Sequence, residues 1–336
     1  MKRLILAGIA IFFFTLSLFL IRSHSNSAPD YAPVSSFKLL PEVIVDIPAG
    51  STGSDIGKLL FQAKIVKSSS AYFRVAVADN RSTKVAPGSH KLTMKISAAQ
   101  ALEQLLDPKR IPNLIKIYEG GWKSEVIESL KAYGYSASEV SKAFIEVNLP
   151  KGFKDSEGLL FPAQYTFAKG TSATQAVQAM IDRFTGESIA QDILKGGKNY
   201  SALELLTIAS IVQAEGDTKD YAQVSRVIRN RLKIGMPLQL DSTVHFVKKV
   251  RGQIFLSTQS TLINSPYNTY KRYGLPPGPI GSPGVEAMRA ALKPAAGDWL
   301  FFITVAPGDT RFTKSIDEFN TWKSLYEKNR KAGAFK

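Results

Sequence analysis

The chain has 336 residues, no cysteine and a net charge of +15. Without cysteine it has neither a disulfide nor a lipid-modified thiol, so its hydrophobic core must stabilise it, which is feasible at this length. The three histidines, His24, His90 and His245, are far apart in the sequence, and no HExxH motif is present. This spacing excludes the usual zinc-hydrolase site, and we expect neither a metal nor another cofactor.

An uncharged segment from Leu4 to Ile21 follows Lys2 and Arg3 and precedes Arg22. At about 1.5 Å per residue this segment spans roughly 27 Å as a helix, just enough for the core of a bilayer. Basic residues at the short N-terminal end favour keeping that end in the cytoplasm, so we expect the rest of the chain outside. A cleaved signal peptide usually has a shorter apolar region. The sequence therefore favours an uncleaved, single-pass anchor in the cell membrane.

The part expected outside keeps a strong positive charge. Residues 1–22 contribute three basic residues and no acidic ones, so +12 of the +15 belongs to residues 23–336. A basic domain beside a membrane suits anionic partners such as lipid headgroups and cell-wall polymers. The expected location argues against nucleic acid as a partner.

A strand–turn–helix–helix pattern occurs twice after a linker rich in Ser, Ala and Pro. In the first copy Val43–Ile47 has the pattern of a strand, Ser54 can cap the next helix, and Ser97 caps a later one. In the second copy Leu114–Ile117 has the pattern of the strand. Two copies predict two small α+β modules, and chance similarity of two short segments is the alternative.

One carboxylate in the C-terminal half is expected to perform chemistry. Glu215 ends a helix whose preceding turns are apolar almost all round, so we expect this helix to be buried. Burial holds a glutamate towards its neutral form, which is the state that a general acid needs at neutral pH. The structural alternative is an exposed glutamate at a helix end that leads into a turn.

The helix after Glu215 has a basic face. Arg226, Arg229 and Arg231 occur along it. Such a face is usually solvated, although beside a carboxylate it can also bind an anionic group.

Two later segments have the composition of a sugar-binding cleft. The first is MPLQLDSTV (236–244), and the second begins with SPYNTY (265–270) and has five prolines between Pro266 and Pro283. Proline makes the second segment rigid and poor in free backbone donors. Tyrosine rings pack on the apolar faces of pyranoses, and Asn and Gln exchange paired hydrogen bonds with hydroxyl and acetamido groups. The alternative is a structural loop whose Tyr and Asn satisfy the local backbone.

In order and spacing, these motifs resemble those of the endolytic murein transglycosylase (YceG-like) family. The resemblance is carried by EGLLFPAQYTF, ASIVQAEG, NRLKIGMPLQLDSTV, and SPYNTY with GLPPGPIGSPG. It runs from about Val43 to the C-terminus, so it covers nearly all of the chain beyond the anchor. It implies an enzyme that cleaves the MurNAc–GlcNAc bond within peptidoglycan strands and leaves a 1,6-anhydroMurNAc end.

The resemblance also assigns the parts of the chain. The expected fold is α+β, with a cytoplasmic tip and transmembrane anchor (1–22), a linker (23–40), a LysM-like module (41–108), an intervening α+β repeat (109–150) and a mixed α+β catalytic domain (151–336). The family's catalytic glutamate falls on Glu215. The positions inferred to line the cleft are Asn230, Gln239, Asp241, Thr243, Tyr267, Asn268 and Tyr270. Expected partners are peptidoglycan glycan strands and the membrane, with peptidoglycan synthases as candidates.

The chain departs from the family pattern at several positions. Members commonly have Glu in place of Gln213, Thr in place of Gly216 and Pro in place of Ser242. Other departures are Ala163-Gln164 where many members have Asp-Thr, Thr310-Arg311-Phe312 for His-x-Phe, and Glu318-Phe319-Asn320 for Glu-His-Asn. The missing threonine bears on rate and specificity more than on the type of reaction. Gln213 leaves Glu215 as the only acid in its helix turn.

A lytic transglycosylase needs only one carboxylate. Ordinary glycosidases use two, about 5–5.5 Å apart for retention or about 6.5–9.5 Å apart for inversion. In the lytic reaction the C6 hydroxyl of the substrate replaces water, so Glu215 protonates the leaving oxygen and then accepts the C6 hydroxyl proton. Two alternatives stay open: a muramidase that uses water with Asp241 as the second carboxylate, and a non-catalytic, membrane-anchored scaffold that binds peptidoglycan.

Overall fold

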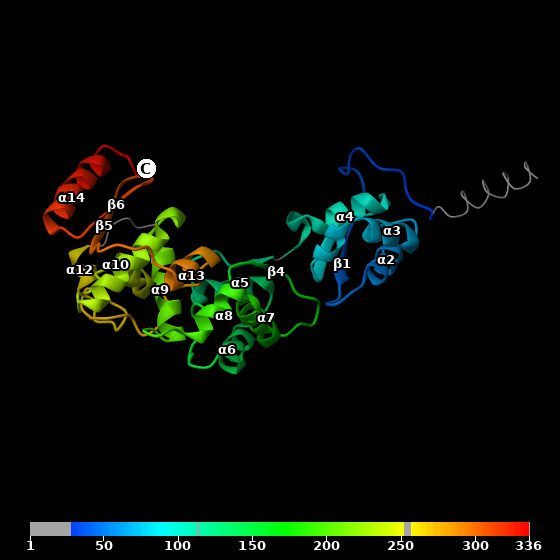
Figure 1. Cartoon of the computed structure of the whole chain (residues 1–336). Coiled ribbons are helices and arrows are strands. Elements are labelled where there is room, and N and C mark those ends of the chain that lie inside the picture. The colour runs from blue at the N-terminus through cyan, green and yellow to red at the C-terminus, as the bar shows by residue number, and fades with distance from the viewer. Residues whose placement is uncertain (1–27, 113, 252–256, 336) are drawn as a thin grey trace, which may run out of the picture. The chain divides into compact units, whose positions relative to one another are not determined.

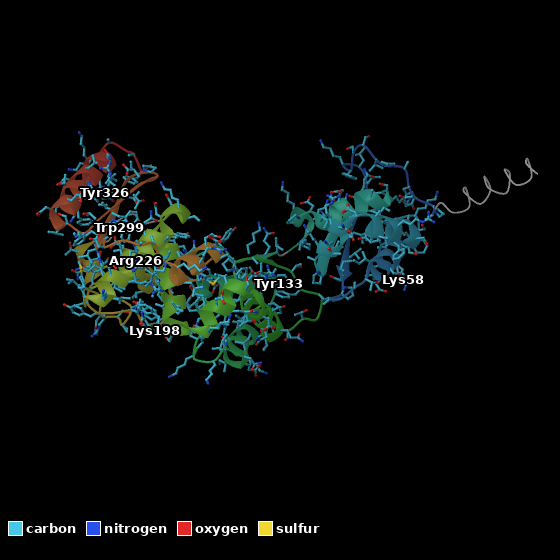
Figure 2. All side chains as sticks on the ribbon, in the orientation of Figure 1. Lys58, Tyr133, Lys198, Arg226, Trp299 and Tyr326 are labelled. Atoms are coloured by element: carbon cyan, nitrogen blue, oxygen red, sulfur yellow. The ribbon has the colours of Figure 1, made fainter. Side chains whose placement is uncertain are left out.

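The computed structural model describes residues 28–112, 114–251 and 257–335, which form a mixed α+β structure, as expected (Figure 1). Helices predominate, and the strands of the described ranges form two-stranded antiparallel pairs. These residues fall into two compact units. One comprises the residues up to Leu114 together with Thr166–Thr171, and the other comprises Ile115–Tyr165 and the residues from Ser172 onwards. Exposed basic side chains such as Lys58 and Lys198 occur on both units (Figure 2).

The first unit packs three helices around one strand pair. Strand β1 (Glu42–Ile47) pairs with β2 (Gly88–Thr93) in a register that joins Glu42 to Thr93 and Ile47 to Gly88. Its other elements are α2 (Gly53–Gln62), α3 (Ser69–Ala78), η1 (Asn80–Lys84), α4 (Ala98–Leu106) and η2 (Pro108–Arg110). The apolar side chains between them form a core in which Leu60, Tyr72 and Leu92 are fully buried.

The predictions for individual elements of this unit have different outcomes. The strand at 43–47 and the helix capped by Ser97 are confirmed. Ser54 as a cap is wrong, because the Thr52 hydroxyl accepts the N–H of Asp55 and the Asp55 carboxylate accepts the N–H of Thr52. This reciprocal pair satisfies two backbone donors and starts α2 one residue before Ser54.

The second unit opens with the second strand–turn–helix–helix segment. It consists of β3 (Ile115–Lys116), α5 (Lys123–Tyr133) and α6 (Ala137–Glu146). Strand β3 pairs with β4 (Gln164–Tyr165), which lies after the two helices in the sequence. The segment is thereby joined to the residues that follow it.

Helix α9 (Ala202–Glu215) lies at the centre of the second unit. All residues from Leu205 to Val212 are buried, which confirms the expected burial of this helix. Four helices pack against it: α8 (Ser188–Lys195), α10 (Tyr221–Lys233), α11 (Asp241–Lys248) and α13 (Val285–Leu292). The remaining elements are α7 (Ala173–Gly186), η3 (Thr218–Asp220), α12 (Thr258–Thr261), β5 (Phe301–Ala306), β6 (Asp309–Thr313) and α14 (Ile316–Lys331).

Two kinds of feature are not found among the described residues. No helix in these ranges is both long enough and apolar enough to cross a membrane, and the predicted anchor at 4–21 lies outside them. The same residues contain no group of three or more His, Asp or Glu side chains placed to hold a metal ion. The anchor, the LysM-like assignment and the domain boundaries stay predictions.

Candidate active site

Glu215 is the last residue of α9, where the chain turns towards α10. The helix ends because Gly216 is extended, with φ −142° and ψ 167°. A side chain at position 216 would bring its Cβ to 3.2 Å from Cγ2 of Val224 on α10. Val224 of α10 therefore packs closely against Gly216 and leaves little room for a side chain beside Glu215.

The Glu215 carboxylate accepts a hydrogen bond from the backbone N–H of Ser242, with an N–Oε1 distance of 3.1 Å. Ser242 lies in the first turn of α11, where N–H groups have no partner within the helix and the helix dipole favours negative charge. The Ser242 hydroxyl is also buried beside this carboxylate, and both the hydroxyl and the N–H favour the charged form of Glu215. Glu215 itself is half-buried and keeps access to solvent.

The surroundings of Glu215 act on its pKa in opposite directions. Burial raises the pKa of its carboxyl, hydrogen bonding from Ser242 opposes the rise, the charge of Asp241 adds to it, and the charge of Arg231 reduces it. Burial is the largest of these effects, so the net effect raises the pKa and shifts the carboxyl towards its neutral form. The N–H of Ser242 and the guanidinium of Arg231 stabilise the carboxylate once its proton has left.

Three other polar side chains surround this carboxylate. Asp241, the first residue of α11, accepts a hydrogen bond from the hydroxyl of Tyr270. Burial and the bond to Asp241 both raise the pKa of Tyr270, so its hydroxyl remains a donor. Arg231 is 7% exposed, and its Nη1 and Nε donate to two loop carbonyls at 2.5 and 2.6 Å. Arg231 thus holds the loop before α11 and also supplies positive charge near Glu215.

Three of the predicted cleft residues are engaged inside the protein. Thr243 and Asn268 are fully buried. Thr243 Oγ1 donates to a backbone carbonyl at 2.7 Å, and Asn268 Nδ2 donates to two carbonyls at 2.9 and 2.8 Å. Asn230 Nδ2 donates to the carbonyl of Trp299 at 2.8 Å. These side chains hold the backbone of the loops around the site.

The two other predicted residues, Gln239 and Tyr267, lie closer to solvent. Gln239 is exposed and has a positive φ of 48°, and its N–H donates to the carbonyl of Thr269 at 3.1 Å. Tyr267 is half-buried and packs on Phe246 with ring centroids 5.1 Å apart, and Phe246 meets Trp122 edge-on at 6.0 Å. Such a row of rings is suited to packing against the apolar faces of sugars.

Hydrogen bonds connect the proline-rich segment and the adjoining Gly284 to α9. Ser210 Oγ accepts the N–H of Ile280 at 3.0 Å, and Gln213 Oε1 accepts the N–H of Gly284 at 2.9 Å. Gln213 Nε2 also donates to the hydroxyl of Tyr221 on α10 at 2.6 Å. One helix thus positions both Glu215 and the rigid loop after the SPYNTY motif.

Sequence reasoning did not assign roles near Glu215 to Ser242, Arg231 and Gln213. Ser242 appeared there only as a departure from the family pattern, and Arg231 as part of a basic face. A usable signal was the polar stretch Asp241–Thr243 before apolar Val244, which is typical of a helix start and so of free N–H groups. The long-range partners of Arg231 and Gln213 had no sequence signal.

Comparisons with known proteins agree with the motifs. The model of the YceG-like family matches residues 45–324. The endolytic murein transglycosylase of Bacillus subtilis (strain 168) is 31% identical over 317 residues, covering 86% of each chain. That of Streptococcus pneumoniae (strain R6) is 30% identical over 298 residues, which are 78% of this chain and 54% of the relative. A crystal structure of a yceG-like protein from Listeria monocytogenes has a TM-score of 0.56 and 29% identity, and the match covers 83% of this chain and 98% of that one. The chain belongs to the YceG-like family.

Proposed function

We propose that the protein is an endolytic peptidoglycan lytic transglycosylase that cleaves the MurNAc–GlcNAc bond within glycan strands. The relatives named endolytic murein transglycosylase, matched over most of this chain, support the reaction class. The observation that carries the proposal is the Glu215 carboxyl, which is half-buried, has a raised pKa and faces the N–H of Ser242. An acid in these surroundings can both give and take back a proton near neutral pH.

The reaction proceeds with one protein carboxyl. Glu215 donates its proton to the glycosidic oxygen as the bond from MurNAc C1 to that oxygen breaks, and the GlcNAc end leaves with a free hydroxyl. The MurNAc C6 hydroxyl then attacks C1, and the Glu215 carboxylate accepts its proton, which restores the acid. The N–H of Ser242 and the positive charge of Arg231 stabilise the carboxylate between these two transfers. The product carries a 1,6-anhydroMurNAc end.

The predicted cleft residues divide between two roles in this proposal. Four side chains that are partly accessible contact the glycan: Asp241, Tyr270, Gln239 and Tyr267. They lie on the segments around Glu215 or in the adjoining row of aromatic rings. The buried side chains of Thr243 and Asn268 and the partly buried amide of Asn230 hold these loops in place through hydrogen bonds to backbone carbonyls.

The proposal includes the location of the enzyme. Residues 4–21 anchor the chain in the cell membrane as a single span, with a cytoplasmic N-terminus and the catalytic domain outside. The module at 41–108 is LysM-like and binds the wall, which fits the net positive charge of the part beyond the anchor. Peptidoglycan synthases are candidate partners.

A muramidase that uses water is the second candidate, because Asp241 is a second carboxylate next to Ser242. Its carboxylate already accepts the Tyr270 hydroxyl. In that case the product has a reducing end and is one water heavier than the anhydro product. A non-catalytic scaffold would bind strands and cleave none.

Mass analysis of digested glycan strands tests the proposal. The full chain is incubated with purified strands beside a Glu215→Gln variant, whose folding is checked by circular dichroism. Internal fragments with anhydroMurNAc ends, made only by the wild type, support the lytic reaction. Reducing-end products would support the muramidase, and binding without cleavage by the folded wild type would support the scaffold.

A further inference from the structure

A cavity in the second unit lies at the other end of α9 from Glu215. Its volume is about 750 Å³, and its lining includes α9 residues up to Thr207, the C-terminal half of α10 and the loop segment 274–277. Thr207 precedes Glu215 by eight residues, which is roughly 12 Å along a helix. The cavity is therefore separate from the acid but within reach of one substrate chain.

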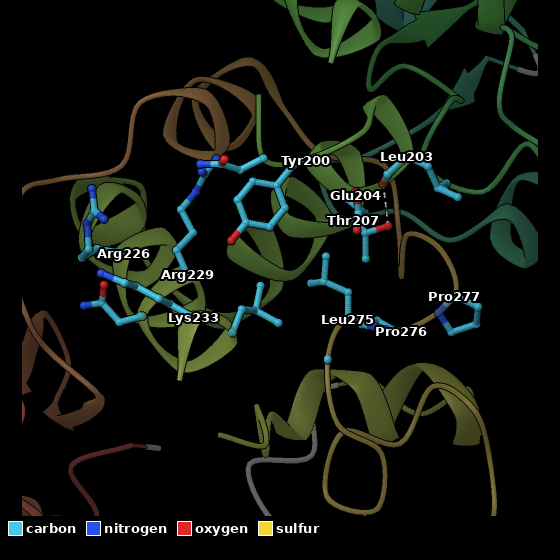
Figure 3. Close-up of a pocket in the computed structure, with 14 residues that line it drawn as sticks. Tyr200, Leu203, Glu204, Thr207, Arg226, Arg229, Lys233, Leu275, Pro276 and Pro277 are labelled. Carbon is cyan, nitrogen blue, oxygen red and sulfur yellow. Dashed lines mark hydrogen bonds between the residues drawn. The ribbon is translucent and has the colours of Figure 1, made fainter. Parts of the chain in front are cut away.

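One wall of this cavity is basic. Arg226, Arg229 and Lys233 recur along α10 at helical spacing, so their side chains lie on one face (Figure 3). Within the described ranges none of the three forms an ion pair with a carboxylate. Glu204 is the only acidic residue among the described residues of the lining, and its carboxylate accepts the N–H and the hydroxyl of Ser201 at 2.7 and 2.8 Å.

The two arginines are held in place by the protein but are not neutralised. Arg226 Nε donates to the carbonyl of Ala295 at 2.5 Å, and Arg229 Nη2 donates to the carbonyl of Ala291 at the end of α13. Arg229 also lies over the ring of Tyr200, 4.6 Å from the ring centroid. Its Nε is buried and has no hydrogen-bond partner among the described residues. Positive charges held close together without a counter-ion are the arrangement of an anion site.

The opposite wall is apolar apart from Glu204 and Thr207 of α9 (Figure 3). Leu203 comes from α9, and Leu275, Pro276 and Pro277 come from the rigid loop (Figure 3). A bare phosphate would leave this wall without contacts. A short acidic peptide has both alkyl segments for this wall and carboxylates for the basic one, and the cavity lies within the usual range of about 300–1,000 Å³ for ligand sites.

We propose, resting on the function proposed above, that this cavity binds a carboxylate of the peptide stem that branches from the glycan strand. An arginine guanidinium pairs with a carboxylate through two hydrogen bonds. Lys233 is exposed at the rim and adds positive charge, and it forms no ion pair with a described carboxylate. The cavity thereby makes the enzyme favour strands that still carry their peptides. Strands stripped of peptides lose this contact.

Kinetics on two substrates test the proposal. Strands with intact stem peptides are compared with the same strands after an amidase has removed the peptides. Lys233→Glu in the full chain is expected to raise KM for peptide-bearing strands by about fivefold to tenfold, with kcat within about twofold, and to leave KM for stripped strands unchanged. The matched control is Lys151→Glu, because Lys151 is exposed and is not part of the lining. Equal effects of Lys233→Glu on both substrates would overturn the proposal.

A binding measurement separates this proposal from the proposed reaction. A soluble stem peptide with free carboxyls is titrated into the wild type, Lys233→Glu and Lys151→Glu, beside the same peptide with its carboxyls amidated. Binding of the free-carboxyl peptide that is lost in Lys233→Glu alone supports the cavity, even if no strand is cleaved. Binding of inorganic phosphate but not of the peptide would identify a phosphate site and overturn the proposal, as would no binding of the peptide.

Discussion

The N–H of Ser242 and the carboxylate of Glu215 lie 3.1 Å apart, although 27 positions separate the two residues in the sequence. Because of this contact, the N-terminal end of α11 points towards the C-terminal end of α9. A carboxylate in that position receives both a hydrogen bond and the favourable end of a helix dipole. The same carboxyl is partly desolvated, which favours its neutral form. The balance between the two effects suits the proposed role of one group as acid and then as base.

Replacing Glu215 by Gln should abolish most activity without affecting the fold. Glutamine keeps the size and an acceptor for the N–H of Ser242 but cannot transfer the proton, so we expect a loss of about 10²–10⁴-fold in kcat. Release of soluble fragments from glycan strands measures this loss. The control is Asp217→Asn, which removes an exposed carboxylate two residues later and should leave activity unchanged. A folded Glu215→Gln protein with normal activity would rule out Glu215 as the acid.

Substitutions at Ser242 should move the pH dependence of the reaction. The proposed reaction needs protonated Glu215, so activity should fall as the pH rises through the pKa of this group. Ser242→Pro removes the N–H donor that favours the carboxylate, so the pKa should rise and the alkaline limb should move to higher pH. Proline is tolerated in the first turn of a helix, where α11 has this residue.

The matched variant is Ser242→Ala, which keeps the N–H and removes only the hydroxyl. Its alkaline limb should lie between those of the wild type and Ser242→Pro, because only one of the two groups that favour the carboxylate is lost. Profiles of kcat/KM against pH for the three proteins give the comparison. Identical profiles for wild type and Ser242→Pro would show that the N–H does not act on Glu215.

Asp241→Asn should lower the pKa of Glu215, because the charge of Asp241 raises it. The alkaline limb should then move to lower pH, and the product should still carry an anhydroMurNAc end. Tyr270→Phe is the companion variant, since it removes the hydrogen bond to Asp241 but leaves the charge in place. If Asp241→Asn instead abolishes cleavage and the wild type releases reducing ends, Asp241 is the second carboxylate of a muramidase.

Gln213 should contribute to stability through two hydrogen bonds. Gln213→Leu leaves the N–H of Gly284 and the hydroxyl of Tyr221 without their partner, which costs about 1–3 kcal/mol. Gln213→Glu should be tolerated, because a carboxylate accepts from both groups if the Tyr221 hydroxyl donates. Urea unfolding of the three proteins measures the difference. Equal stability of the Leu and Glu variants would contradict this role.

Glu157 should make the stability of the second unit depend on pH. Its carboxylate accepts the N–H of Lys123 at 3.1 and 3.2 Å, and burial raises its pKa to about 7. Since this pKa lies above its value of 4.5 in the unfolded chain, the folded state binds the proton more tightly. Stability should therefore fall as the pH rises from 5 to 8, by on the order of 2–3 kcal/mol from this group.

Thermal unfolding between pH 5 and pH 8 tests this linkage. Glu157→Gln keeps an acceptor for the N–H of Lys123 and cannot ionise, so its melting temperature should fall less over this range than that of the wild type. Glu128→Gln, at an exposed glutamate paired with Lys131, should behave as the wild type does. The same pH dependence in Glu157→Gln would place the effect in another group.

The sequence alone determined the family, the element order around Glu215 and the burial of α9. These follow from motifs and from apolar periodicity, both of which are local in the chain. The apolar turns before Glu215 predict a buried helix because a side chain's neighbours on a helix lie three and four positions away. The α+β class also followed from such local patterns. The cap of α2 was misplaced because Thr52 and Ser54 are both suitable caps by residue type, and the Thr52–Asp55 pair decides between them.

Only the tertiary structure decided what surrounds the acid. The N–H of Ser242, the charge of Arg231 and the loop bonds of Gln213 join segments far apart in the sequence, and helix packing selects these partners. The tertiary structure also shows that Thr243 and Asn268, predicted to line the cleft, are buried and bonded to backbone carbonyls. A polar side chain in a loop looks the same in sequence whether it faces a substrate or the protein interior. Which of the two it does depends on the fold, because a buried polar group must find its partner inside the protein.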